Sequence, residues 1–134
     1  MPREIEQTCN GFQQTVSLHL IRHRSILDVM TKYQDACARV NRALAKAVTT
    51  CGCLTINAGK QELPADASLS EMSEYVKTHL EGRLCPNCAE VLEEEMGKSM
   101  FFLTAICTLT GTDLVEIIKA ENNRISTLGF YSLT

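Results

Sequence analysis

The sequence has few of the features that mark disordered, membrane-spanning or nucleic-acid-binding chains. It contains no Trp, three Pro and seven Gly in 134 residues, and 45% of the residues are hydrophobic, so a disordered composition is excluded. No apolar run approaches the roughly 20 residues of a membrane span. The net charge of −3 gives no basis for general binding to nucleic acid. We therefore expect a folded, soluble protein with neither a membrane nor a nucleic acid among its partners.

The N-terminal residues, the chain length and the number of cysteines predict the compartment and the number of domains. Residues 1–7 lack the apolar core of a signal peptide, so we expect a cytoplasmic protein. A chain of this length can bury one core, which predicts a single domain over residues 1–134. Seven is an odd number of cysteines, and in a reducing compartment they are better explained as metal ligands and buried thiols than as a disulfide framework.

Apolar residues at helical spacing predict an all-α fold. They recur every seven positions from Ile26 to Ala47, which is typical of one long buried helix. Ser68 with Glu71 three residues later forms a capping box and predicts the start of a further helix. Residues 54–60 are too short and isolated to predict a sheet. The expected fold is a bundle of four to five helices. Helices are predicted over residues 17–50, 68–80, 86–109 and 113–123.

Two pairs of cysteines stand where predicted helices end and begin. Cys51 and Cys53 follow the first long helix, and Cys85 and Cys88 flank the start of a later one. The short C-x-C and C-x-x-C loops bring sulfurs together at little loop-closure cost, and four thiolates suit the tetrahedral coordination of zinc. We therefore predict a four-cysteine zinc site that clasps the helices, in which His79 could replace one sulfur. A redox dithiol, an iron–sulfur cluster and plain buried thiols remain open.

Charged residues on two predicted helices form a second candidate site. Glutamates three or four residues apart could present carboxylates to Mg²⁺, which would organise a polyphosphate. Cations on the long helix could meet phosphates or these carboxylates, although a solvated face and the helix dipole explain the same pattern. His19 and His23 lie four apart without a nearby third ligand, and we interpret them as structural. The candidate residues are Glu90, Glu94, Glu95, Lys98, Arg39, Arg42 and Lys46.

Four segments of the C-terminal part share a pattern with a known family. The run Glu94 to Lys98 (EEMGK), followed by Met100 to Leu103, Thr112 to Leu114 and Lys119 to Arg124, resembles the C-terminal half of the MazG-type nucleoside triphosphate pyrophosphohydrolases. The resemblance implies an all-α, oligomeric protein that releases pyrophosphate from nucleotides. It also implies Mg²⁺ held by E-x-x-E on one helix and E-x-x-D on the next.

The sequence departs from that family at the metal motif. Glu95 falls on the glutamate of E-x-x-D, but Lys98 stands where the aspartate belongs, and residues 39–46 contain no glutamate. Because cations in place of carboxylates repel Mg²⁺, we predict a non-catalytic nucleotide-binding, phosphate-binding or regulatory protein. A dimer is expected, since the long apolar stripe needs a partner to cover it. The alternatives are an active Mg²⁺-dependent pyrophosphohydrolase using Glu90, Glu94 and Glu95, and a thiol redox sensor.

Overall fold

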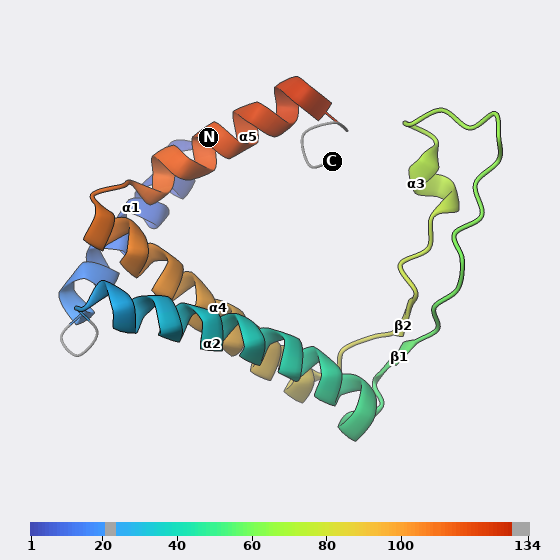
Figure 1. The fold of residues 1–134 in the computed structure, drawn as a ribbon, viewed down its shortest axis with the longest axis horizontal. Coiled ribbons are helices and arrows are strands. Elements are labelled where there is room, and N and C mark those ends of the chain that lie inside the picture. The colour runs from blue at the N-terminus through green and yellow to red at the C-terminus, as the bar shows by residue number, and fades with distance from the viewer. Residues whose placement is uncertain (21–23, 130–134) are drawn as a thin grey trace. The chain divides into compact units, whose positions relative to one another are not determined.

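The computed structural model describes residues 1–20 and 24–129, and these are mostly helical (Figure 1). The helical content predicted from the sequence is therefore confirmed. The elements in chain order are α1 (Arg3–His19), α2 (Ile26–Lys46), a π-helical turn η1 (Ala47–Cys51), β1 (Leu54–Ile56), α3 (Met72–Tyr75), β2 (Leu80–Gly82), α4 (Pro86–Thr110) and α5 (Leu114–Leu128).

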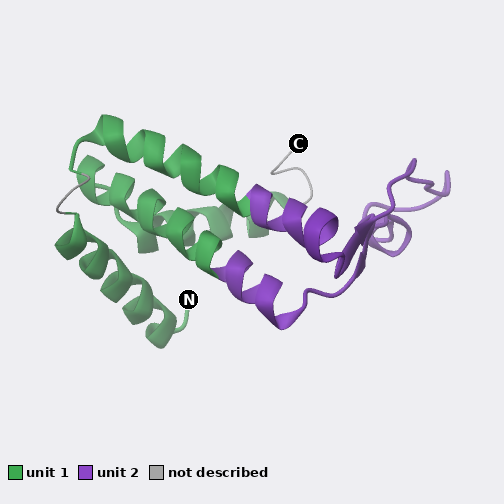
Figure 2. Cartoon of the chain, turned by 90° about the horizontal axis from the view of Figure 1, so that it is seen from below, with its two compact units in different colours: residues 1–40, 94–134 green, residues 41–93 purple. Residues whose placement is uncertain are grey.

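The chain divides into two compact units (Figure 2). Unit 1 comprises residues 1–40 and 94–134, and unit 2 comprises residues 41–93. Both α2 and α4 run from one unit into the other. The expectation of a single domain therefore stays a prediction.

The first part of the chain differs from the sequence prediction. One continuous helix was expected from residue 17 to residue 50, but α1 already ends at His19 and α2 begins at Ile26. The prediction was wrong here because α1 has an apolar face of its own, on which Val16 is fully buried. The seven-residue repeat that starts at Ile26 belongs to α2 alone.

Unit 1 is built around a small apolar core contributed by α1, α2 and α4. Val16, Leu20, Val29 and Ala105 form a buried cluster. Burial of these side chains is the main source of stability for the unit, because removing apolar area from water dominates folding. The partly buried residues packed against the cluster are Phe12, Phe101, Phe102, Ile106 and Leu109.

Polar contacts hold α5 against α1 in the same unit. The side chain of Gln13 donates to the carbonyl of Thr112 at 3.0 Å and accepts from the backbone N–H of Leu114 at 2.8 Å. Lys119 on α5 pairs with Glu6 on α1 at 2.9 Å. Asp113 caps α5 by accepting from the backbone N–H of residue 116, as its sequence position predicts.

Unit 2 contains a two-stranded antiparallel sheet that the sequence did not predict. Leu54 pairs with Gly82 and Ile56 pairs with Leu80. The prediction that residues 54–60 form no sheet was wrong because the partner strand comes from the far end of the same loop. We call residues 54–84 the arm, since β1 and β2 lie at its base (Figure 1).

The helix predicted over residues 68–80 is reduced to the single turn α3. The backbone N–H of Ser68 does donate to the carboxylate of Glu71 at 3.2 Å, which is one half of a capping box. The Ser68 hydroxyl, however, hydrogen-bonds that of Ser70 at 3.1 Å and caps no helix. The chain becomes extended at Val76 and enters β2 at Leu80.

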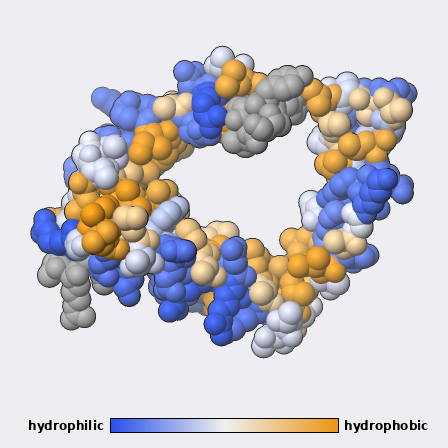
Figure 3. All heavy atoms as spheres, viewed as in Figure 1, coloured by the Kyte–Doolittle hydropathy of each residue, from blue (hydrophilic) through white to orange (hydrophobic). Residues whose placement is uncertain are grey.

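Large apolar side chains also reach the surface, where they alternate with hydrophilic residues (Figure 3). Leu18 on α1 and Leu27 on α2 are 76% and 71% exposed. Among the described residues, no helix taken singly has the length and hydropathy needed to cross a membrane. Only α4 and α5 together meet that test, and they form a pair bent by 107°.

Candidate metal centre

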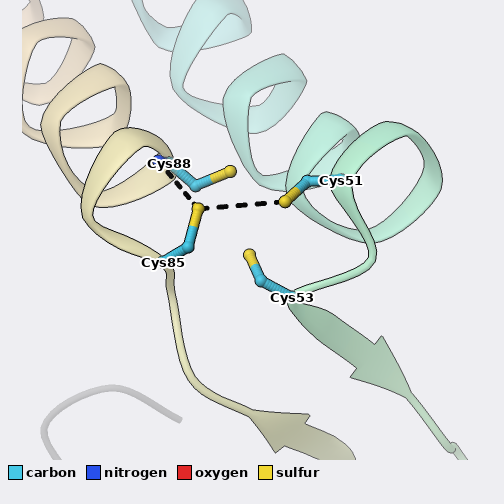
Figure 4. Close-up of side chains that lie close together, drawn as sticks. All are labelled: Cys51, Cys53, Cys85 and Cys88. Atoms are coloured by element: carbon cyan, nitrogen blue, oxygen red, sulfur yellow. Dashed lines mark hydrogen bonds between the residues drawn. The ribbon is translucent and has the colours of Figure 1, made fainter.

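The four predicted cysteines meet at one point of unit 2 (Figure 4). Their Sγ atoms all lie within 4.8 Å of one another, and those of Cys51 and Cys85 are 3.8 Å apart. Cys51 is exposed, whereas Cys53, Cys85 and Cys88 are half-buried. The structure therefore brings together the whole cysteine set and can hold a metal ion there.

The spacing of the sulfurs can be compared with the size of one ion. Zinc–sulfur bonds of about 2.3 Å in a tetrahedron place neighbouring sulfurs about 3.8 Å apart. The distance between Cys51 and Cys85 equals that edge length. The other separations stay within 4.8 Å, so they exceed that edge by at most about 1 Å.

The C-x-C loop is shaped by the end of η1. Gly52 adopts a left-handed conformation with φ of 81°, and its N–H donates to the carbonyl of Ala47 at 2.9 Å. A glycine at this position ends the helix at no steric cost, because it has no Cβ. The chain therefore turns at Gly52, and the sulfurs of Cys51 and Cys53 face the same point (Figure 4).

The C-x-x-C loop opens α4. Pro86 is the first residue of the helix, where its missing N–H costs nothing, as the sequence predicts. The backbone N–H of Cys88 donates to the Sγ of Cys85 at 3.4 Å (Figure 4). A sulfur that receives an N–H at a helix N-terminus is stabilised as thiolate, which is the form that binds metals.

Gly82, at the base of the arm, lies close against the backbone of the C-x-C loop. It lies in β2 with φ of 87°, and a Cβ at this position would come within 2.4 Å of the carbonyl oxygen of Cys53. Only glycine allows this approach of the two backbones. The helix predicted over residues 68–80 gave no strand at residue 82, so this role was not predicted from the sequence. No local pattern marks this role, because the contact exists only when Cys53 lies opposite.

Neighbouring groups shift the pKa values of Cys51, Cys85 and Cys88. The backbone N–H of Cys88, followed by its thiol, lowers the pKa of Cys85 to about 7. The hydrogen bond to Cys85, followed by desolvation, raises the pKa of Cys88 to about 12. The pKa of Cys51 is affected in both directions. Hydrogen bonds from the Cys53 backbone and the Cys88 thiol lower it. The thiols of Cys85 and Cys53, together with desolvation, raise it by more, so the net shift is upward. Several thiolates this close repel one another, and a bound cation would remove that repulsion.

The remaining histidine and cysteine candidates lie outside the site. Within residues 1–20 and 24–129, the four cysteines are the only group of three or more His, Cys, Asp or Glu side chains close enough to share an ion, so His79 is not part of one. His19 Nδ1 hydrogen-bonds the carbonyl of Thr15 at 2.8 Å, in line with a structural role. His23 lies outside the described residues. The other three cysteines, Cys9, Cys37 and Cys107, are not in the cluster.

The predicted carboxylates do not come together as a metal-binding group. Glu90, Glu94 and Glu95 belong to no such group in the described part of the chain. Lys98 lies 3.6 Å from Glu95 Oε1, while Glu95 Oε2 is buried and has no hydrogen-bond partner among the described residues.

The predicted cations on α2 differ in their surroundings. Arg39 donates to Asp35 at 3.0 Å, and this contact, with a smaller contribution from Glu95, raises the pKa of Arg39. Arg42 and Lys46 are exposed, and no ion pair to either is present among residues 1–20 and 24–129.

Comparison with protein-family models, with curated proteins and with solved structures finds no match for the chain.

Proposed function

We propose that Cys51, Cys53, Cys85 and Cys88 bind one zinc ion and that this ion fixes the base of the arm. The main support for the proposal is that all four sulfurs lie within 4.8 Å of one another. This spacing suits one ion better than an iron–sulfur cluster, in which several irons and sulfides would lie between the thiolates. Four protein ligands leave no open position for water or substrate, so the role of the zinc is structural.

The chain as a whole is best interpreted as a non-catalytic binding or regulatory protein. A Mg²⁺-dependent hydrolase needs converging carboxylates, and Glu95 instead lies beside the cation Lys98. Arg42 and Lys46 are one helical turn apart and exposed in unit 2, so they can contact phosphate oxygens. The resemblance to MazG-type proteins supports a nucleotide as the source of that phosphate.

A second copy of the chain is the expected partner. Met96, Met100 and Leu103 follow one another at helical spacing on α4 and are 43%, 55% and 42% exposed. An apolar stripe of this kind is stabilised when another helix covers it. We infer that α4 contributes to a dimer interface.

Elemental analysis of the full chain, purified under reducing conditions, tests the zinc site. The expected content is about one zinc per chain, set by four thiolate ligands around one ion. The double variant Cys85→Ser with Cys88→Ser should lose it, and the matched double variant Cys9→Ser with Cys37→Ser should keep it. Finding neither zinc nor iron in the unmodified chain would refute the proposed site.

Nucleotide binding is tested separately by calorimetry with ATP at low salt. Replacing Arg42 and Lys46 by Ala should weaken binding, because each removes a cation that faces phosphate. Lys32→Ala on the same helix is the control and should have no effect. Release of pyrophosphate that Glu95→Gln abolishes would favour the hydrolase over the non-catalytic protein.

A further inference from the structure

The sulfurs of Cys51 and Cys85 lie close enough to form a disulfide bond as well as to bind a metal ion. They are 3.8 Å apart, and the two residues flank the arm on either side in the sequence. A disulfide bond has a length of about 2.05 Å, so modest side-chain rotation would bring the sulfurs together. Cys51 is the exposed member of the four, so an oxidant from solvent reaches it first, and coordination to zinc would hold its sulfur as the thiolate despite its raised pKa.

We propose that hydroperoxides oxidise Cys51 and Cys85 to a disulfide and thereby expel the zinc. This inference rests on the proposed function, because it presupposes a bound ion. It makes the metal centre a redox-regulated site and identifies the two residues that react.

The oxidation of Cys51 and Cys85 to a disulfide takes place in two steps. The Cys51 thiolate attacks one oxygen of the hydroperoxide, so that an S–O bond forms, the O–O bond breaks and hydroxide or alkoxide leaves. The Cys85 thiolate then attacks the sulfur of Cys51, an S–S bond forms, the S–O bond breaks and hydroxide leaves. Two protons from solvent neutralise the leaving groups. The two sulfurs lose two electrons, and the peroxide gains them.

Which two cysteines form the disulfide determines whether the ends of the arm stay joined. After oxidation only Cys53 and Cys88 remain as ligands, and two thiolates do not complete a tetrahedral zinc site. The ion leaves, but the new bond still joins the two ends of the arm. A disulfide inside either pair, such as Cys85 with Cys88, would release the ion and leave those ends unjoined.

The test uses the full zinc-loaded chain treated with hydrogen peroxide. Zinc is measured before treatment by elemental analysis and during treatment with a chromogenic chelator, and disulfides are located by non-reducing peptide mapping with fragmentation. We expect loss of the bound zinc together with a bond between Cys51 and Cys85. Dithiothreitol and added zinc should reverse both changes. A triple variant with Ser at Cys9, Cys37 and Cys107 should behave identically.

Two single variants separate the reacting thiol from a ligand that only binds. Cys51→Ser and Cys53→Ser each remove one ligand, but only Cys51→Ser should abolish the peroxide-induced bond to Cys85. Zinc retained under peroxide, or released with a bond inside one pair, would overturn the redox inference and leave the zinc site standing. Absence of zinc before treatment would refute the site itself, and the inference with it.

Discussion

Replacing Gly82 by Ala should weaken zinc binding although residue 82 is not a ligand. The new Cβ would lie 2.4 Å from the carbonyl oxygen of Cys53, whereas such atoms essentially never approach closer than 3.0 Å. One backbone must therefore move by about 0.6 Å. Metal–ligand distances tolerate deviations of only about 0.2 Å, so the shift displaces Cys53 from the ion.

The magnitude follows from the backbone conformation. Gly82 has φ of 87°, and a non-glycine residue held in that region costs about 1 to 3 kcal/mol. Because residue 82 contacts the backbone of Cys53, a proposed ligand, we expect this cost as a loss of zinc affinity of roughly 5- to 150-fold.

Competition titration with a chelator of known affinity measures the effect. Gly59→Ala is the matched control: it lies in the same arm, its Cβ would meet nothing within 4 Å, and its φ is not positive. Equal zinc affinity in the Gly82→Ala variant and the unmodified protein would refute the link between the arm and the metal centre.

Three further predictions concern the metal, the helices and the assembly. Zinc affinity should rise with pH through the pKa of Cys85, about 7, and should keep rising above it, because the thiols of Cys51 and Cys88, whose pKa values are raised, must still release protons to bind. Titrations in two buffers of different ionisation enthalpy measure the protons released. Gln13→Ala should lower the free energy of unfolding by about 1 to 2 kcal/mol, because its two hydrogen bonds to the backbone of Thr112 and Leu114 are lost. Gln14→Ala is the control and should leave that free energy unchanged. Urea unfolding of both variants measures the difference. Light scattering should show a dimer that Met100→Glu dissociates, and a monomer at tens of micromolar would contradict the proposed interface on α4.

The sequence predicted those features whose signals are local. The repeat from Ile26 marks α2, Pro86 marks the start of α4, and Asp113 marks the start of α5, because each depends on neighbours within a few residues. The four cysteines were found for a similar reason, since each pair closes a short loop.

Features that depend on distant partners could not be predicted in this way. β1 is too short to be stable alone and exists because β2 returns to pair with it. The value of glycine at residue 82 is visible only when Cys53 lies opposite. The segment between α1 and α2 contains neither Gly nor Pro, and its local signal is Ser25, which stands three residues before Asp28 and marks the start of α2 rather than the end of α1.

Closing the arm at its base has a consequence for how this region can change during evolution. A zinc ion bound as proposed would fix the ends of residues 54–84 regardless of what lies between them. Doubling the length of a flexible loop costs only about 0.6 kcal/mol once its ends are held, which is small beside the free energy of binding a structural zinc ion. Insertions and deletions between β1 and β2 should therefore leave the cysteines and both helix ends in place. The arm is thus a part of this protein where new sequence can accumulate.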